Sequence, residues 1–593
     1  MPDYHNTHAL VLEQQHKFDA AERIWRELCQ TDPLHADALY NLGKLLLGRG
    51  DHDAAVACFE RALKLRPAWA DAAKNLGCGH FSAGNKVAAE AAFNHALGLA
   101  PQDPEICLNL ARLRQDADDF DGAMIFYRMA LERKVDGAVL LRFAMLCPIF
   151  CADAEAVRSN RGRVMDNLLA LDTQPLTLNQ PATALANPAF YFAYHGVNDR
   201  ELMTRLGDII ERAWHPSPLP VLTRPSPRRR IVFVSAFFKQ HTIGRLYAPL
   251  IERLPRDEFN LTVLNVGAHD DAMAQRIAAA DTAVSVAANH ASARLALHEL
   301  DADIIFYTDI GMDPTTFWLA AERLAPVQSV GWGHPVTTGL ATMDYFVSSS
   351  LLEPDGAEAH YCETLMQFAA WPGLYDDPGT PLAAQYTRTD FGFADGEHVY
   401  LCPQSLFKLH PDFDAYLAAI LRQDDSAVVT LIESRAPWRH RLETRFDTRL
   451  GKLAERIRFI PTQSTAAYHA LLAVADVVLD TIHFSGGFTS FETLWAETPV
   501  VTERGAFMRG RVTAGLYDLL GIESAITSGA DEYAECALEL AHNGAVRRAF
   551  TEALGDRKRR LLDLDASVLP AYVDFFSSTL AAAENIRARG LTS

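Results

Sequence analysis

The chain has no long apolar run, no closely spaced cysteine pair, and fewer basic than acidic residues. No apolar stretch approaches the ~20 residues that a helix needs to span a bilayer. The first residues lack the basic segment and apolar core of a secretory signal, so we expect none. The nine cysteines are scattered without a CxxC pair, which favours small buried thiols in a protein of the reducing cytoplasm.

Charge and length exclude further classes of protein. The 75 acidic and 55 basic residues give a formal net charge of −20 at pH 7, which argues against a general nucleic-acid binder. The chain has 593 residues, of which 49% are hydrophobic. We therefore expect a soluble protein of several folded domains, on the order of three to five.

A repeat with a period of 34 residues fills the first part of the chain. Pairs of small residues begin at positions 20, 54, 88 and 122, and one large aromatic recurs at Trp25, Phe59, Phe93 and Tyr127. A proline follows at 33, 67 and 101 and is expected to end the second helix of each unit. This is the tetratricopeptide signature of two antiparallel helices per unit. We expect about three and a half repeats over residues 1–136, with an incomplete first unit, and an aromatic that fills the gap to the next unit.

Such arrays present a concave face that suits an extended peptide. Asn41, Asn75 and Asn109 recur at the same register and are candidates for a ladder that hydrogen-bonds a peptide backbone. The alternative is that this repeat simply favours asparagine at that position.

Residues 137–225 lose the period but keep helical spacing of apolar positions, notably at 158–171 and 200–214. Prolines 216, 218, 220, 225 and 227 then indicate a stiff linker. We therefore expect a helical connector and a domain boundary near residue 225.

Two α/β domains are predicted after the linker, at 226–380 and 381–593, with a hinge at 372–381. Short apolar runs alternate with helical patterns, which predicts parallel sheets of Rossmann type. Expected strands of the first domain are 231–235, 261–264, 283–286, 304–307, 327–330 and 345–347, and those of the second are 399–402, 428–432, 457–460, 477–479 and 500–501. The predicted fold class is an α-solenoid followed by GT-B, the architecture of nucleotide-sugar transferases in which two such domains face across a cleft.

The stretch from Val477 to Trp495 has the pattern of a phosphate site. A buried strand ends at Asp480, a loop with Ser485, Gly486 and Gly487 follows, and Thr489 and Ser490 stand at a helix start. Glycines let backbone N–H groups approach an anion, hydroxyls add donors, and the helix dipole adds positive charge. Glu492, just inside the helix, is well placed for ribose hydroxyls. The alternative is an ordinary turn between a strand and a helix.

Five motifs carry a family resemblance. They are HTIGRL (241–246), APVQSVGWGHPVTTGLATMDYF (325–346), HYCETL (360–365), CPQSLFKLHPD (402–412) and DTIHFSGGFTSFETLWAETPVVT (480–502). Together with the repeats they resemble the bacterial members of the protein O-GlcNAc transferase and SPINDLY family, glycosyltransferase family 41. The resemblance covers nearly the whole chain.

The resemblance implies a donor site in the second α/β domain. Lys408 matches the family's essential lysine and would neutralise the departing diphosphate. The other expected donor contacts are Gln404, Ser405, Tyr468, Ser485, Gly486, Gly487, Phe488, Thr489, Ser490 and Glu492. Tyr468 stands where relatives have a histidine that stacks on uracil, and it can still stack. A fixed lysine and a helix N-terminus can replace a divalent metal, so no metal and no cofactor are expected. The two DxD sequences, at 301–303 and 412–414, are interpreted as solvated turns.

On the acceptor side, the resemblance implies that His241 is catalytic or positions the substrate, with a neutral imidazole able to accept a proton near pH 7. Gly244 would allow close backbone approach. The remaining expected residues of the acceptor-side cleft are Gln328, His334, Pro335, Thr337 and Thr338, for which packing is the alternative.

The implied activity is an inverting, metal-independent transfer of GlcNAc or another hexose from a UDP-sugar to Ser or Thr of a protein bound along the repeats. One alternative is a related N-glycosyltransferase that puts glucose on Asn, which typically lacks tetratricopeptides. The other is a non-catalytic protein-binding scaffold. No nucleic-acid partner and no membrane span are expected, and the oligomeric state is left open, a homo-oligomer included.

Overall fold

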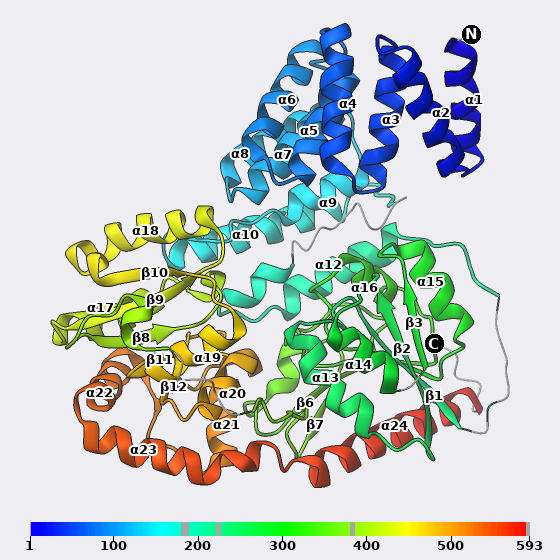
Figure 1. Ribbon diagram of the computed structural model, residues 1–593. Helices are drawn as coiled ribbons and strands as arrows, with labels where there is room; N and C mark the ends of the chain where they lie inside the picture. The colour runs from blue at the N-terminus through cyan, green and yellow to red at the C-terminus, as the bar shows by residue number, and fades with distance from the viewer. Residues whose placement is uncertain are drawn as a thin grey trace. The chain divides into compact units, whose positions relative to one another are not determined.

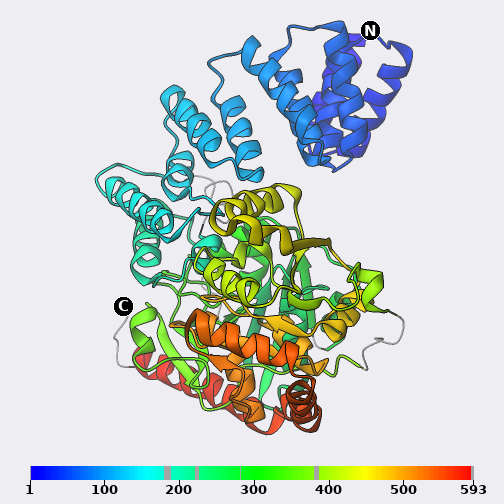
Figure 2. The same ribbon diagram turned by 90° about the vertical axis from the view of Figure 1, so that its left-hand side faces the viewer.

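The structure is a computed structural model that describes residues 2–178, 189–220, 226, 228–280, 282–379 and 386–588 (Figures 1 and 2). The chain divides into two units, residues 1–148 and 149–593. The prolines at 225 and 227, and the boundaries expected near 225 and 380, lie outside the described residues. None of the described helices is long and apolar enough to cross a membrane.

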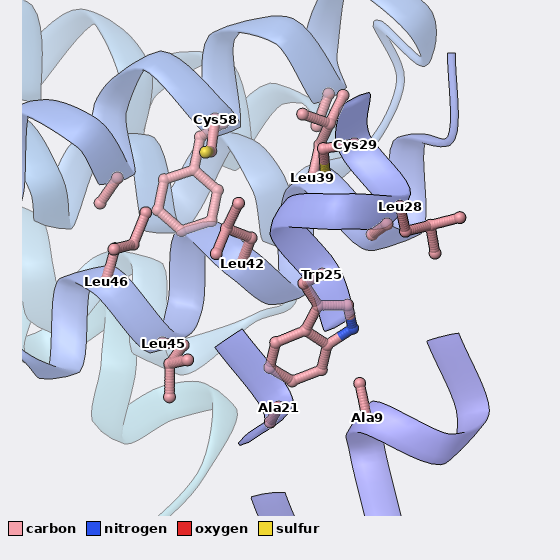
Figure 3. Close-up of a cluster of buried hydrophobic side chains, with 14 residues drawn as sticks. Ala9, Ala21, Trp25, Leu28, Cys29, Leu39, Leu42, Leu45, Leu46 and Cys58 are labelled. Carbon is pink, nitrogen blue, oxygen red and sulfur yellow. The ribbon is translucent and has the colours of Figure 1, made fainter. Parts of the chain in front are cut away.

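The first unit is built from consecutive antiparallel helix pairs, as the repeat predicts. Its helices are α1 (Pro2–Gln14), α2 (Phe18–Thr31), α3 (Ala36–Gly48), α4 (His52–Leu65), α5 (Ala70–Ser82), α6 (Lys86–Leu99), α7 (Pro104–Asp116), α8 (Phe120–Arg133) and α9 (Gly137–Met145). The first tetratricopeptide repeat, α1 and α2, is complete, contrary to expectation, because α1 has 13 residues, as α3 does. Ala9 of α1 lies in the same buried cluster as Trp25 (Figure 3).

The repeated aromatics are buried, and two of them, Phe59 and Phe93, pack on a glycine of their own repeat. A Cβ placed on Gly43 would lie 2.8 Å from the ring of Phe59, and one on Gly77 would lie 2.5 Å from the ring of Phe93. The aromatic therefore fills a gap left by glycine between the two helices of one unit. Phe93 also lies in one buried cluster with Ile106, Leu110 and Leu113 of the next repeat, as the sequence analysis expected.

The repeated asparagines join consecutive units. Asn41 Nδ2 donates to Asn6 Oδ1 at 3.1 Å, and Asn75 Nδ2 donates to the hydroxyl of Tyr40 at 3.0 Å. Asn109 makes the corresponding, longer contact with a thiol of the preceding unit. Part of each amide is thus used inside the array, and its binding of a peptide stays a prediction.

The helical connector belongs to the second unit and contacts both α/β domains. It comprises α10 (Ala154–Leu171), the short 3₁₀ helix η1 (Phe190–Tyr194) and α12 (Arg200–Ala213) (Figure 1). Phe150, before α10, packs edge-on against Trp438 of the second domain at 6.0 Å. Trp214, after α12, packs against Trp318 of the first domain at 5.7 Å.

The first α/β domain has a seven-stranded parallel sheet in the order β3-β2-β1-β4-β5-β6-β7. All six predicted strands are present, and the edge strand β7 was not predicted. The strands are β1 (Arg229–Ser235), β2 (Phe259–Val266), β3 (Thr282–Val286), β4 (Ile304–Tyr307), β5 (Val327–Val330), β6 (Tyr345–Ser349) and β7 (Thr364–Phe368), and the helices are α13 (Thr242–Arg253), α14 (Ala272–Ala280), α15 (His290–Glu299) and α16 (Pro314–Ala320).

The second domain has a parallel sheet in the order β10-β9-β8-β11-β12-β13. Its strands are β8 (His398–Cys402), β9 (Ala427–Glu433), β10 (Ile457–Pro461), β11 (Val477–Leu479), β12 (Val500–Glu503) and β13 (Ile526–Thr527), and its main helices are α17 (Phe413–Gln423), α18 (Ala436–Leu450), α19 (Thr465–Val474), α20 (Phe488–Trp495), α21 (Val512–Leu520), α22 (Gly529–His542) and α23 (Gly544–Arg557). The strand order reverses at β1/β4 and at β8/β11, and ligands of such sheets bind outside the carboxyl ends of the strands at this point.

The last helix, α24 (Asp565–Ala588), returns to the first domain (Figure 1). The ring of Tyr572 lies 5.9 Å from that of Phe306, and Phe576 lies 6.2 Å from Phe233. The helix thus covers the first sheet, although the domain limits expected from the sequence assign it to the second.

Candidate functional site

Lys408 is held at the point where the second sheet reverses its strand order. It ends the short helix η5 (Leu406–Lys408), which follows β8. Its Nζ donates to Gln404 Oε1 and to the backbone oxygen of Ser485, both at 2.9 Å. The ammonium group also lies 4.6 Å from the centre of the Phe484 ring. The loop after β11 and the turn after β8 therefore meet at this cation.

Burial lowers the pKa of Lys408 to about 8, while Asp480 acts in the opposite direction. The side chain is protonated at neutral pH, and its hydrogen bonds to Gln404 and Ser485 go to neutral oxygens. A cation held in this way, without a bonded carboxylate, can attract the charge of an approaching phosphate.

The two glycines of the loop have different roles. Gly486 donates its N–H to Asp480 Oδ1 at 2.6 Å, so this group is already used inside the protein. A Cβ on Gly486 would lie 2.1 Å from Ser490 Oγ and 2.5 Å from Gln404 Nε2. Gly487 is the N-cap of α20, and a Cβ on it would meet no atom within 4 Å. Gly486 is therefore needed for packing, and Gly487 stands at the open helix N-terminus.

The other predicted donor contacts of this loop divide in the same way. Ser485 Oγ donates to the Arg509 carbonyl at 3.2 Å and accepts from Val512 N–H at 3.1 Å, so the hydroxyl supports the loop. Ser490 Oγ pairs with the hydroxyl of Thr513 at 2.7 Å and is also buried. The structure thus gives these two hydroxyls partners inside the protein, where the sequence analysis expected donor contacts.

Three further predicted residues surround this point. Thr489 Oγ1 accepts a hydrogen bond from Gln404 Nε2 at 3.0 Å, which links the loop to the turn that carries Lys408. Ser405 is exposed, and its carbonyl accepts the N–H of Lys408 at 2.9 Å. The ring of Phe488 lies under the guanidinium of Arg245 at 5.4 Å.

Glu492 bridges three helices. Its Oε1 lies 3.1 Å from Arg245 Nη1 of α13 and 3.1 Å from His469 Nε2 of α19. The carboxylate is 7% exposed. Tyr468 is the residue next to His469, and burial raises its pKa well above the ordinary value. The sequence analysis singled out Tyr468 and missed both Arg245 and His469, although His469 is adjacent to Tyr468.

His241 is the N-cap of α13, and its Nδ1 accepts the N–H of Ile243 at 3.2 Å. Burial, with help from Lys239 and Arg245, lowers its pKa to about 4. A neutral imidazole that accepts at Nδ1 carries its proton on Nε2, so the free nitrogen is a hydrogen-bond donor. This geometry favours positioning of a substrate over proton acceptance.

One glycine, Gly244, and one buried acid, Asp309, lie close to the carboxyl ends of β1 and β4 in the first domain. A Cβ on Gly244 would lie 2.2 Å from the Lys239 carbonyl, so only glycine fits where α13 meets the preceding loop. Asp309, after β4, is 1% exposed and accepts from Thr308 Oγ1 at 2.6 Å. Burial raises its pKa to about 7. The sequence analysis missed this acid, whose only signal is its place directly after a buried strand.

Three of the residues expected in the acceptor-side cleft are packing residues. Gln328 is fully buried near the start of β5. The amino ends of the parallel strands lie at the edge of the sheet opposite to the candidate site. The Gln328 amide bonds the backbone N–H of Leu324 and the carbonyls of Glu322 and Thr342. Thr337 and Thr338 both hydrogen-bond the buried carboxylate of Glu363. These side chains thus have partners inside the first domain, Thr337 also lines the pocket that Pro335 lines, and their role in binding an acceptor stays a prediction.

His334 and Pro335 lie where the connector meets the first domain. The imidazole stacks on Phe190 of η1 at 5.1 Å, and burial lowers its pKa to about 3. Pro335 lines a small pocket together with Asp199 of the connector and Arg509 of the second domain. This pocket brings together three parts of the chain that are distant in sequence.

The two DxD sequences are ion-paired, contrary to the interpretation as solvated turns. Arg230 binds Asp301 at 2.6 Å and Asp303 at 3.4 Å. Asp414 is buried between two arginines of α18. Asp412 hydrogen-bonds His483 at 2.9 Å. Two groups of three side chains bring their nitrogen and oxygen atoms within 4.8 Å of one another. One group is His410, Asp412 and His483, and the other is His398, Asp424 and His542.

Fold and site together define a tetratricopeptide protein joined to a GT-B-type pair of parallel α/β domains, with a lysine and a glycine-rich helix N-terminus at the reversal of the second sheet. The family models agree. Residues 381–562 match glycosyl transferase family 41, and residues 6–73 and 40–104 match the tetratricopeptide repeat. The resemblance found in the motifs is thus confirmed over residues 381–562, and the helical repeats are confirmed over residues 6–104.

Curated relatives carry transferase names. The chain is 25% identical over 354 residues, 57% of its length, to an Arabidopsis thaliana protein named "Probable UDP-N-acetylglucosamine--peptide N-acetylglucosaminyltransferase SEC" and covers 36% of that protein. It is 28% identical over 41% of its length to the UDP-glucose:protein N-beta-glucosyltransferase of Actinobacillus pleuropneumoniae and covers 38% of it. The chain thus spans less than two-fifths of the length of these two relatives.

A solved structure supports the fold. A mutant of the Thermobaculum terrenum O-GlcNAc transferase superposes with a TM-score of 0.56 at 23% identity, over 98% of each chain. The predicted order of helical repeats and two parallel-sheet domains is therefore confirmed.

Proposed function

We propose that this protein is a glycosyltransferase that moves a sugar from a UDP-sugar to a protein side chain. The observation that carries the proposal is the position of Lys408, whose ammonium is held by Gln404 and the Ser485 carbonyl beside the open N-terminus of α20. The names of the two curated relatives, both UDP-sugar protein transferases, support the same substrate classes.

The diphosphate of the donor would lie between Lys408 and Gly487. The lysine charge and the partial positive charge of the α20 N-terminus would together stabilise the leaving diphosphate, without a need for a metal. Thr489 stands in the first turn of the same helix, and Glu492 one turn further on. We assign Glu492 to the ribose, because its carboxylate can accept hydrogen bonds from sugar hydroxyls.

The transfer would invert the anomeric centre in one displacement. The acceptor oxygen attacks the anomeric carbon on the face opposite to the diphosphate, the bond to the diphosphate oxygen breaks, and the proton of the acceptor passes to an oxygen of the departing diphosphate. His241 contributes by donating a hydrogen bond from Nε2 and so orienting a substrate oxygen. Ser or Thr of a protein that binds along the repeats is the acceptor we propose.

Transfer to asparagine is the second candidate. One relative is named an N-beta-glucosyltransferase, which favours it. The tetratricopeptide repeats over 6–104 favour the O-linked reaction. Mapping of the modified residue by fragmentation mass spectrometry decides between Ser or Thr and Asn.

A thermal-shift screen of nucleotide sugars tests the site. We expect one UDP-sugar to raise the melting temperature of the wild type strongly and that of Lys408→Ala weakly. The matched control is Lys452→Ala, an exposed lysine of the same domain, which keeps the full shift. Equal shifts in Lys408→Ala and the wild type contradict the role of Lys408. The absence of binding by any nucleotide favours the scaffold alternative.

A further inference from the structure

We propose that the connector, in its described residues 149–178 and 189–214, is a positioning element of the donor site, and that it holds Lys408 in place through Arg509 and through the rings of η1. The inference rests on the proposed function, since it assigns a task to residues that act through Lys408. It makes the connector part of the catalytic machinery rather than a spacer between the repeats and the transferase domains.

An ion pair ties the connector to the second domain. Asp199 is the N-cap of α12 and pairs with two arginines. Its Oδ1 lies 2.8 Å from Arg161 Nη1, and its Oδ2 lies 3.0 Å from Arg509 Nη2. Arg509 also donates to the carbonyl of Val197 at 2.7 Å. All three charged groups are buried, at 2% exposure for Asp199, 9% for Arg161 and 4% for Arg509. A charged side chain buried in this way keeps one position, because any other position would leave its charge buried without a partner.

The backbone of Arg509 connects this ion pair to the loop between β11 and α20, residues 480–487, which we call the donor loop. Its carbonyl accepts the N–H of Ser485 at 2.8 Å and the Ser485 hydroxyl at 3.2 Å. The carbonyl of Ser485 in turn accepts Lys408 Nζ at 2.9 Å. Three consecutive contacts therefore lead from Asp199 of the connector to the ammonium group.

The rings of η1 provide a second, independent route. Tyr194 lies 4.7 Å from Phe407, the residue before Lys408, and 4.6 Å from Phe484. The Phe484 ring carries the Lys408 ammonium at 4.6 Å. Phe190, four residues earlier, contacts Phe407 at 5.7 Å and stacks on His334 of the first domain. The short helix thus packs between the two α/β domains beside the lysine.

This packing shields the half-buried Lys408 from part of the solvent. The titratable groups that face it are Asp480 after β11 and Cys402 at the end of β8, and burial nevertheless lowers its pKa to about 8. If the connector is loosened, water reaches the ammonium, and its pKa moves towards the ordinary value of 10.5. A purely structural support far from the lysine would leave this titration unchanged.

The test replaces Asp199 by Asn, which keeps the shape and removes the charge. The matched control is Asp172→Asn, because Asp172 also pairs with two arginines, at 2.9 and 2.6 Å, and both of these arginines belong to α12 of the connector itself. Lysines are reductively methylated with ¹³C and titrated by NMR, and the Lys408 signal is assigned by its loss in Lys408→Arg. Donor kcat and KM are measured alongside.

We expect Lys408 to titrate near 8 in the wild type and in Asp172→Asn, and at least about one unit higher in Asp199→Asn. We also expect kcat in Asp199→Asn to fall by about 10- to 100-fold, with a smaller change in KM, because a displaced lysine acts mainly on the leaving group. An unchanged titration and an unchanged kcat in folded Asp199→Asn overturn the inference.

If Asp199→Asn does not fold, Tyr194→Leu tests the second route with the same expected and contrary results. The NMR titration needs no substrate. A wild type that shows the low titration but binds no UDP-sugar would therefore contradict the proposed function while leaving the coupling between connector and lysine measurable.

Discussion

Arg245 of the first α/β domain and Glu492 of the second lie 3.1 Å apart, Nη1 to Oε1, with the carboxylate also 3.1 Å from His469 Nε2. The residue that we assign to the ribose is therefore oriented by a cation from the opposite domain. Glu492 is almost buried, whereas Arg245 is 28% exposed at its side chain. The pair thus joins the two domains at the donor site.

The first prediction concerns this pair. Glu492→Gln should weaken UDP binding about tenfold, because a charged acceptor of ribose hydroxyls is replaced by a neutral one. Arg245→Ala should weaken it less, and the double variant should resemble Glu492→Gln alone. Calorimetric titration of UDP into the wild type, the two single variants and the double variant gives the coupling free energy between Arg245 and Glu492, which we expect at about 0.5–3 kcal/mol. Strictly additive effects would show that Arg245 does not orient Glu492.

The second prediction separates the two glycines. Gly486→Ala should destabilise the protein and abolish donor binding, since its Cβ would collide with Ser490 and displace Gln404, a partner of Lys408. Gly487→Ala should leave the melting temperature unchanged, because its Cβ meets open space, yet reduce UDP affinity by crowding the phosphate. Melting curves with and without UDP test both. Normal UDP affinity in Gly487→Ala would place the diphosphate elsewhere.

The third prediction concerns the pH dependence of kcat/KM for the donor. Lys408 has a pKa of about 8 in the empty protein, so its charge, and with it the rate, should decline above that pH. His241 has a pKa of about 4, so it stays neutral through the neutral range and should produce no change near pH 6.5. A rate profile that is flat to pH 10, or an inflection near 6.5 that disappears in His241→Asn, contradicts these assignments.

The fourth prediction concerns stability at low pH. Burial lowers the pKa of His334 to about 3, below its value of 6.5 in the unfolded chain. The unfolded state therefore binds a proton first, and stability is lost as the pH falls from about 6.5 towards 3. His334→Phe can keep the stacking on Phe190 but cannot bind a proton. It should therefore lower the slope of the free energy of unfolding against pH by about 1.4 kcal/mol per pH unit in this range. Melting temperatures against pH, with exposed His440→Phe as the control, should show a shallower decline only for His334→Phe.

The buried strands were the easiest elements to predict. The bounds of β4, β5 and β11 agree with the sequence analysis. The strands β4 and β11 are continuous apolar runs, as expected of strands that are covered on both faces. The edge strand β7 was missed, since most of its residues are partly exposed and its sequence is mixed. The return of α24 to the first sheet could not be predicted, because no local pattern tells which sheet a helix covers.

The site was predicted where function depends on local backbone shape. Lys408 and Gly487 occupy the positions that the strand, loop and helix pattern indicated. The contacts that complete the site join residues far apart in the chain, such as Arg245 and Glu492 at a separation of 247 positions. Spacing carries no signal for such pairs. Gln328 was misassigned for the same reason, since its partners became visible only in the fold.

The most direct test of the central claim is mass spectrometry of a protein acceptor after incubation with each UDP-sugar and the enzyme. The account predicts a hexose or N-acetylhexosamine increment on a Ser or Thr side chain, with release of UDP. It also predicts that Lys408→Ala loses this increment and that Lys452→Ala retains it. An equal increment with Lys408→Ala, or no UDP release and no UDP binding by the wild type with any sugar, would contradict it.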